Sequence, residues 1–102
     1  MLTRWWRWWR ERRPSSDAEV VLFTRAGCHL CEEAHEFLHA EQARLPFRLV
    51  VRDVDASPET RHEYGECVPV VLVDGRVRFR GRIDPVLWRR LMRHRSRGSA
   101  GS

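Results

Sequence analysis

The chain has 102 residues and a formal net charge of +5, so it can form one domain with a single modest hydrophobic core. The positive charge belongs to the ends: residues 1–13 hold five arginines and one acid, residues 89–102 hold five arginines and no acid, and the segment between them is net acidic. A nucleic-acid-binding domain gathers its basic residues on a structured face, so this distribution excludes nucleic acid as the expected partner.

The cysteine count and the hydropathy pattern indicate the compartment. Three cysteines are too few, and odd in number, for a disulfide scaffold. Arginine interrupts every apolar pair near the N-terminus, so we expect no signal peptide, and no apolar run approaches the length of a spanning helix. The sequence therefore predicts a cytoplasmic protein, in which a Cys-x-x-Cys motif indicates redox or metal chemistry.

Residues 1–16 form a leader rich in tryptophan and arginine, which ends in a Pro-Ser-Ser linker. Placed on a helix at about 100° per residue, Leu2 and the four tryptophans fall on one side and the arginines on the other. Such a helix suits a membrane interface, so residues 2–13 are candidates for peripheral membrane contact. The alternative is a disordered leader without function, because so short a helix is marginal alone in water.

We place the domain at residues 17–95. The sequence of its first half predicts a strand, a helix and a second strand. The apolar run Val20–Thr24 fits a buried central strand. A helix is expected from Cys28 to about Arg44, because apolar residues recur there at helical spacing, namely Leu30, Ala34, Phe37 and Leu38. Leu45-Pro46 ends this helix, and Phe47–Val54 follows as the second strand.

The second half of the domain begins with a short helix that Ser57 caps and Pro58 opens. We expect this helix to end at a left-handed cap on Gly65. Val70–Val73 is predicted as the third strand, and Asp74-Gly75 as a two-residue hairpin turn.

The hairpin leads into a fourth strand, Arg76–Arg80, with Val77 and Phe79 on one face. Asp84-Pro85 starts a last helix whose apolar stripe comprises Leu87, Trp88, Leu91 and Met92. Residues 96–102 are rich in Gly, Ser and Arg and are expected to form a disordered tail. The order β-α-β-α-β-β-α predicts an α/β fold with a small mixed sheet covered by helices.

The motif Cys28-His29-Leu30-Cys31 lies where the first strand meets the first helix. Free N–H groups and the helix dipole favour an anion there, so a thiol at Cys28 loses its proton more readily and becomes the nucleophile. Cys31 stands one turn further along, placed to attack a mixed disulfide on Cys28 and release the product. We therefore predict Cys28 as the attacking thiolate and Cys31 as the resolving thiol.

Two further positions bear on this chemistry. A protonated His29 would stabilise the Cys28 thiolate and make the protein more oxidising, whereas an exposed imidazole would have little effect on that thiolate. Pro69 follows Val68 at the start of a predicted strand, where the missing N–H is tolerated. A cis bond there would leave the backbone of Val68 open to pair with an extended substrate.

Three segments together resemble the glutaredoxin branch of the thioredoxin-like superfamily over residues 19–95: VVLFTRAGCHLCEEAHEFL at residues 20–38, Cys67-Val68-Pro69-Val70 and Gly81-Arg82-Ile83-Asp84. Leu22, six residues before the first cysteine, replaces the buried aspartate usual in thioredoxin proper. The resemblance implies a sheet of order 2-1-3-4, a cis Pro69 facing Cys28, and thiol–disulfide exchange with a low-molecular-weight thiol.

The same resemblance implies partners and binding residues. Against a glutathione-like tripeptide, Arg25 would contact the carboxylate, Val68 the backbone and Asp84 the amino group. No bound cofactor or metal is expected, since the glutathione-like thiol is a co-substrate. The expected partners are disulfide-containing proteins or small-thiol mixed disulfides, and the expected state is a monomer.

Two other functions stay open on the residues alone. Cys28, Cys31 and Cys67, with His35 one helical turn after Cys31, could hold zinc or an iron–sulfur cluster. Alternatively, the protein is a membrane-tethered interaction protein whose functional part is the Trp/Arg leader. Cys67 itself, two residues before Pro69, could form an alternative disulfide or simply pack as a small buried residue.

Overall fold

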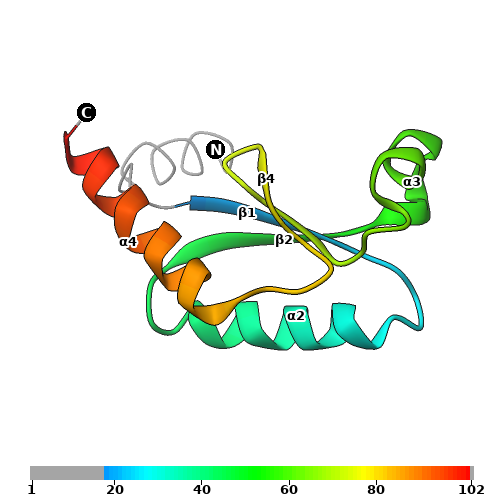
Figure 1. The fold of residues 1–102 in the computed structure, drawn as a ribbon, viewed down its shortest axis with the longest axis horizontal. Coiled ribbons are helices and arrows are strands. Elements are labelled where there is room, and N and C mark those ends of the chain that lie inside the picture. The colour runs from blue at the N-terminus through cyan, green and yellow to red at the C-terminus, as the bar shows by residue number, and fades with distance from the viewer. Residues whose placement is uncertain (1–17, 102) are drawn as a thin grey trace, which may run out of the picture.

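A computed structural model describes residues 18–101, with side chains described as far as Arg95. Its sheet contains β1 (Ala18–Thr24), β2 (Phe47–Asp53), β3 (Val70–Val73) and β4 (Arg76–Arg80), in the order β2-β1-β3-β4 (Figure 1). β2 runs parallel to β1, whereas β3 and β4 are antiparallel additions on the other side. The strand order and the mixed sheet expected from the sequence are confirmed.

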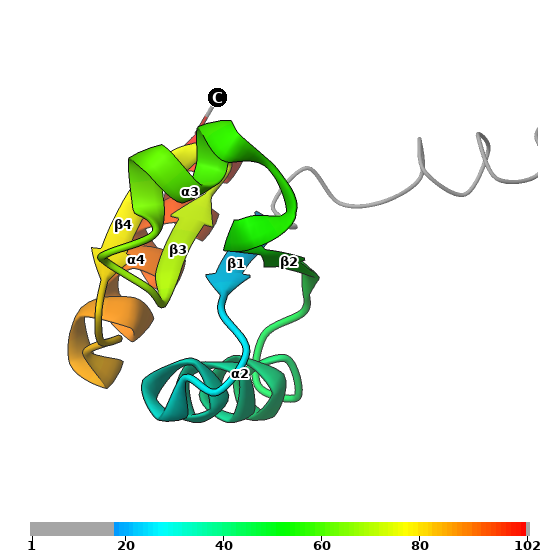
Figure 2. The same ribbon diagram turned by 90° about the vertical axis from the view of Figure 1, so that its right-hand side faces the viewer.

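Helices cover both faces of this sheet. α2 (His29–Glu41) and α3 (Pro58–Tyr64) lie on opposite sides of it in Figures 1 and 2, and the short 3-10 turn η1 (Val54–Ala56) joins β2 to α3. α4 (Pro85–Gly101) shares a buried apolar cluster with α2, so the two helices pack on the same face. The order β-α-β-α-β-β-α is confirmed among the described residues.

The main core fills the space between the sheet and the α2–α4 layer. Trp88 lies at its centre, 1% exposed, with its ring against Phe37, Phe47 and Phe79. Fully burying side chains of this size stabilises the fold by about 1.5–3 kcal/mol each, so this cluster fixes α4 against α2. Met92 is also buried and Leu91 packs at the edge, but Leu87, expected in the same stripe, is half exposed.

A second, smaller cluster lies on the opposite face, under α3. Val77 belongs to this cluster, whereas Phe79 packs into the main core on the other face. The prediction that the two share one face is therefore wrong. The reason is a β-bulge, because Phe79 pairs with Val71 and Val77 pairs with the next residue, Leu72, so one extra residue re-aims the strand.

The helix ends follow the predicted capping residues with one exception. The Ser57 hydroxyl accepts the Thr60 N–H at 3.2 Å, and Pro58 is the first residue of α3. Gly65, however, is not left-handed: its φ is −57°, so the left-handed cap predicted there is wrong. Glycine is required for another reason, because an added Cβ would collide with the carbonyl oxygen of Arg61.

The two ends of the chain limit what the structure tests. The leader expected over residues 1–16 lies outside the described residues, and so does its expected contact with a membrane surface. The backbone of α4 continues through Gly101, but its side chains beyond Arg95 lie outside the description, so the disordered tail expected over residues 96–102 stays a prediction. Among the described helices, none combines the length and the apolar character needed to cross a bilayer.

Candidate active site

Cys28 occupies the N-cap of α2, directly after the loop that leaves β1. Its backbone is extended, with φ −92° and ψ 109°, and its N–H donates to the carbonyl of Arg25 at 3.2 Å. Its Sγ accepts the backbone N–H of Cys31 at 3.2 Å, in the position that a serine or aspartate oxygen takes in an ordinary cap. A thiolate formed here would receive the same hydrogen bond and the favourable end of the helix dipole.

Cys31 lies one turn into α2, and the two sulfur atoms are at disulfide distance with their Cα atoms 5.2 Å apart. The two cysteines differ in access. Cys31 is buried, with 2% of its surface exposed, whereas Cys28 is partly exposed. An incoming sulfur atom can therefore reach Cys28 more easily than Cys31, while the roles predicted for the two thiols stay predictions.

A cavity of about 230 Å³ opens beside the pair. Its lining comes from the β1–α2 loop, the first turns of α2 and strand β2, and comprises residues 24–28, Cys31, Glu32, His35 and Val51. His35, which the sequence suggested as a metal ligand, is thus at the rim of this cavity. Within residues 18–101, however, no three His, Cys, Asp or Glu side chains come together as a metal-binding group, so the metal alternative gains no support.

Arg25 is held by acidic and carbonyl oxygens of the chain itself. Its Nε and Nη2 donate to the two carboxylate oxygens of Asp55 at 2.9 and 3.0 Å, and its Nη1 donates to the carbonyl of Gly65 at 2.8 Å. Hydrogen bonds from Arg25 hold the pKa of Asp55 below its ordinary value, helped by the nearby charge of Arg61. The guanidinium predicted to bind a tripeptide carboxylate therefore ties the loop before Cys28 to η1 and to the end of α3.

His29 lies at the start of α2 with 84% of its side chain exposed. Its Nε2 is 3.0 Å from a carboxylate oxygen of Glu33, one turn along the helix. The imidazole is thus exposed and paired with an acid on the outer surface of α2. Its predicted effect on the Cys28 thiolate stays a prediction.

The Val68–Pro69 bond is cis, as the resemblance implied. Pro69 is buried, and its carbonyl accepts the N–H of Gly81 at 2.7 Å, which fastens the loop after β4 to the start of β3. Val68 and Cys67 pack at the edge of the smaller cluster, and Cys67 is a free, partly buried thiol. That Pro69 faces Cys28, as the resemblance implied, stays a prediction.

Asp84 is the N-cap of α4. Its Oδ1 accepts the N–H of Val86 at 2.9 Å and of Leu87 at 3.3 Å, and its backbone carbonyl accepts the N–H of Trp88. The sequence predicted this cap, and it also assigned Asp84 to a substrate amino group on the strength of the resemblance. Because Oδ1 of Asp84 is used by the helix cap, the other carboxylate oxygen is the one left to contact a substrate amino group.

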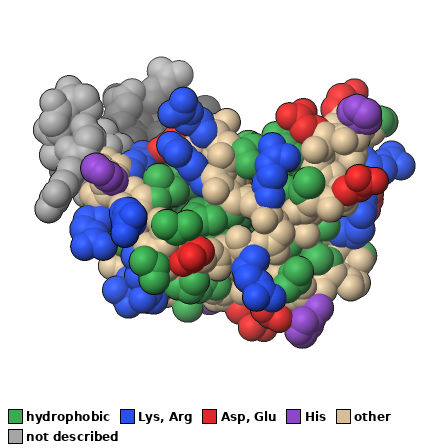
Figure 3. Space-filling model, in the orientation of Figure 1, with side chains coloured by type: hydrophobic (Ala, Val, Ile, Leu, Met, Phe, Trp, Pro, Cys, Tyr) green, Lys and Arg blue, Asp and Glu red, His purple; other side chains and the backbone are tan. Residues whose placement is uncertain are grey.

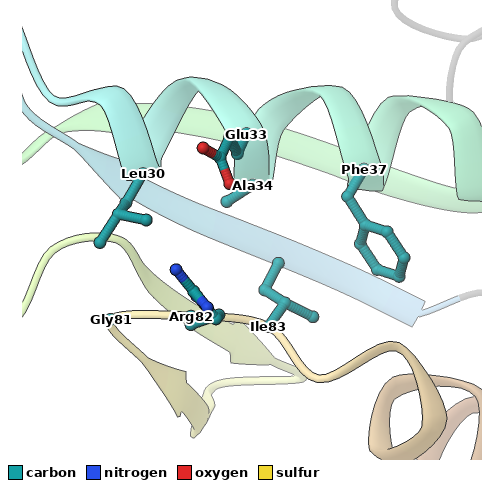
Figure 4. Close-up of a pocket in the computed structure, with 7 residues that line it drawn as sticks. All are labelled: Leu30, Glu33, Ala34, Phe37, Gly81, Arg82 and Ile83. Atoms are coloured by element: carbon teal, nitrogen blue, oxygen red, sulfur yellow. The ribbon is translucent and has the colours of Figure 1, made fainter.

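Sequence reasoning missed a second cavity, of about 290 Å³, between α2 and the segment 81–83. In Figure 4, Leu30 and Phe37 point from α2 toward this segment, and Arg82 and Ile83 point back toward the helix. Glu33, Ala34 and Gly81 complete the lining. The missed signal is Leu30 itself, which fits the apolar stripe of the helix by spacing but sits between the two cysteines and is 37% exposed.

Comparisons with known proteins show the family and the fold of this chain. The family described as glutaredoxin-like domain (DUF836) matches residues 19–91. The uncharacterised protein Rv0508 of Mycobacterium tuberculosis is 41% identical over 66 residues, which cover 60% of this chain and 68% of the relative.

Two solved structures are also similar. The protein Ne2328 of Nitrosomonas europaea superposes with a TM-score of 0.66 at 26% identity, covering 74% of this chain and 91% of its own. A thioredoxin of Halobacterium salinarum superposes with a TM-score of 0.62 at 18% identity, covering 81% and 78%. The fold is therefore α/β and thioredoxin-like.

Proposed function

Since the chain belongs to the glutaredoxin-like domain family, we propose that it catalyses thiol–disulfide exchange through Cys28 and Cys31. One observation carries the proposal: the sulfur atom of Cys28 sits on the open N-terminus of α2, partly exposed and hydrogen-bonded by the N–H of Cys31, with the Cys31 sulfur buried directly behind it. That arrangement favours one attacking thiolate and one protected resolving thiol.

The reaction has two exchange steps. In the reduced protein, the Cys28 thiolate attacks one sulfur of a partner disulfide, forms a mixed disulfide with it and expels the other partner sulfur as a thiolate. The Cys31 thiol then loses its proton, attacks the Cys28 sulfur and expels the second partner sulfur. The partner gains two electrons and, after protonation, two thiols, while the protein is left with the Cys28–Cys31 disulfide.

A low-molecular-weight thiol of glutathione type closes the cycle in this proposal. Two such thiols supply two electrons and two protons, return Cys28 and Cys31 to thiols and leave as a small-molecule disulfide. The backbone of Val68 and the second oxygen of Asp84 are the groups proposed to hold it. Arg25 would then act in the same site through its remaining N–H groups, since Asp55 and Gly65 take the others.

Replacing each cysteine in turn tests the proposal. Cys28→Ser is expected to abolish exchange, because no other exposed thiolate is placed on the helix end. Cys31→Ser is expected to let the first step proceed and to accumulate a mixed disulfide on Cys28, since the resolving thiol is gone. Turnover of a small disulfide with glutathione as reductant, and intact-protein mass spectrometry of the trapped adduct, measure the two effects.

Cys67→Ser is the matched control. Cys67 is a free and partly buried cysteine outside the motif, so its loss is expected to leave exchange unchanged. Full turnover by Cys28→Ser, or an adduct that maps to Cys67 in the Cys31→Ser protein, would contradict the assignment of roles.

A further inference from the structure

The cavity between α2 and residues 81–83 begins at the redox motif. Leu30, which lines it, stands between the two cysteines in the chain and is 37% exposed. Phe37 and Ile83 give the cavity an apolar interior, and Gly81, with φ +83° and no atom within 4 Å of the place that a Cβ would take, leaves its rim open. A polypeptide whose disulfide lies at Cys28 would therefore pass within reach of an apolar hollow large enough for one side chain.

The two charged residues of this cavity are not equivalent. Glu33 is already paired with His29 at 3.0 Å. Arg82, which comes from the opposite wall and points into the gap in Figure 4, has no hydrogen bond or ion pair with any described residue. Of the two charged groups that line the cavity, Arg82 is therefore the one that has no partner among the described residues.

The surroundings extend this positive character. Arg80, at the end of the edge strand β4 and two residues before Arg82, is exposed and likewise has no ion pair among the described residues. On the face drawn in Figure 3, basic side chains lie over β4 and α4 with hydrophobic side chains between them. Val86 and Leu87, at the start of α4 and three and four residues after Ile83, are 65% and 49% exposed. Exposed apolar area of this kind next to a reactive group indicates a surface that binds another molecule.

We propose that this cavity is the specificity pocket for protein partners: it takes one apolar side chain of a disulfide-bearing polypeptide, and Arg82 pairs with an acidic residue beside that side chain. The inference rests on the proposed thiol–disulfide exchange and names the class of partner, an acidic segment that carries a disulfide. The leader of this chain is a poor occupant by the same reasoning, because residues 1–13 carry five arginines and one acid.

A pair of disulfide-bridged peptides tests the proposal on the full-length protein. The two peptides carry a leucine near one half-cystine and differ in the next residue, which is glutamate in one and lysine in the other. For the unmodified protein, kcat/KM is expected to be roughly fivefold higher with the glutamate peptide, the size of one exposed ion pair. About 0.5 M salt should reduce this preference, because it screens exposed charges.

Arg82→Glu is expected to reverse the preference between the two peptides. Arg76→Glu is the matched control: it makes the same charge change at another exposed, unpaired arginine, at the far end of β4 and outside the cavity. This control is expected to keep the preference for the glutamate peptide.

The outcomes separate the pocket from the redox function. If the unmodified protein turns over neither peptide nor a small uncharged disulfide, the proposed function fails. Turnover of all three substrates without a charge preference, or a preference that Arg76→Glu reverses as fully as Arg82→Glu, overturns the pocket alone. A change in the KM for glutathione in Arg82→Glu, with peptide preference intact, would assign the cavity to the small thiol and likewise overturn the proposal.

Discussion

At the scale of the residue, the site depends on one sulfur atom that replaces the usual oxygen of a helix cap. The Sγ of Cys28 accepts a hydrogen bond from the backbone N–H of Cys31. This bond holds the proposed nucleophile next to the proposed resolving residue in the absence of a substrate. The sequence predicted this placement because a Cys-x-x-Cys motif followed an apolar strand at the start of a helical pattern. Both features depend only on residues that are neighbours in the chain, so the sequence alone is enough to predict them.

Gly65 illustrates a residue whose role the sequence did not reveal. Its place at the end of α3 suggested a left-handed conformation, but its φ is −57° and close packing explains the glycine. A Cβ there would collide with the Arg61 carbonyl oxygen and lie 3.0 Å from the Arg25 guanidinium. The Arg61 carbonyl lies one helical turn before Gly65, whereas the Arg25 guanidinium comes from a loop forty residues away, so the residue type at position 65 does not by itself predict this crowding.

Gly65→Ala is therefore expected to lower the stability of the protein. Because the end of α3 or the Arg25 side chain must shift, the expected cost is about 1–2 kcal/mol, which lowers the Tm by roughly 4–16 °C in a domain of this size. Thermal unfolding followed by circular dichroism measures it. Glu63→Ala, an exposed substitution on the same helix, is the control, and an unchanged Tm in Gly65→Ala would contradict the packing argument.

At the scale of the elements, ion pairs link segments that are far apart in sequence. Asp55 of η1 holds the loop before Cys28 through Arg25, and Glu41 of α2, nearly buried, pairs with Arg89 of α4 at 3.1 Å. Sequence reasoning assigned Arg25 to a substrate and named no partner for Glu41. Partners of this kind depend on the packing of whole helices, which residue spacing does not contain. The same limit explains the bulge that separates Val77 from Phe79.

The Arg25–Asp55 pair predicts a dependence of stability on pH. The pKa of Asp55 is lowered in the folded protein, chiefly by hydrogen bonds from Arg25, so the unfolded chain binds the proton more tightly. The stability that the pair contributes is therefore present above the ordinary aspartate pKa of about 3.9 and is lost as the pH falls below it. Since both side chains are more than one third exposed, solvent screening keeps the effect small.

Asp55→Asn measures this contribution. The Tm of the variant is expected to lie below that of the unmodified protein at neutral pH, and the difference is expected to shrink as the pH falls through the acidic range. Glu36→Gln, an exposed residue of α2, serves as the control for removing one carboxylate. A difference that stays constant or grows toward low pH would contradict the sign derived from the lowered pKa of Asp55.

At the scale of the whole molecule, the fold brings three distant segments to one end of the sheet. The redox motif follows β1, the cis Val68–Pro69 bond precedes β3, and residues 81–83 follow β4, with Gly81 hydrogen-bonded to Pro69. The order of the elements predicted the small mixed sheet and the family resemblance implied its strand order, both of which the structure confirms, whereas the assignment of Cys28 as the nucleophile stays a prediction from the Cys-x-x-Cys motif. The sequence alone could not predict the cavity beside α2, because its walls come from segments about fifty residues apart.

The central claim is that Cys28 is the ionised, reachable sulfur of the pair, and competitive alkylation tests it most directly. The reduced, unmodified protein is treated with limiting iodoacetamide slightly below neutral pH, and the labelled cysteines are mapped by mass spectrometry. The account predicts labelling of Cys28 at least about tenfold faster than of Cys31 or Cys67, since thiolate fraction and exposure both favour it. Labelling of Cys31 or Cys67 first, or of all three at one rate, would contradict it.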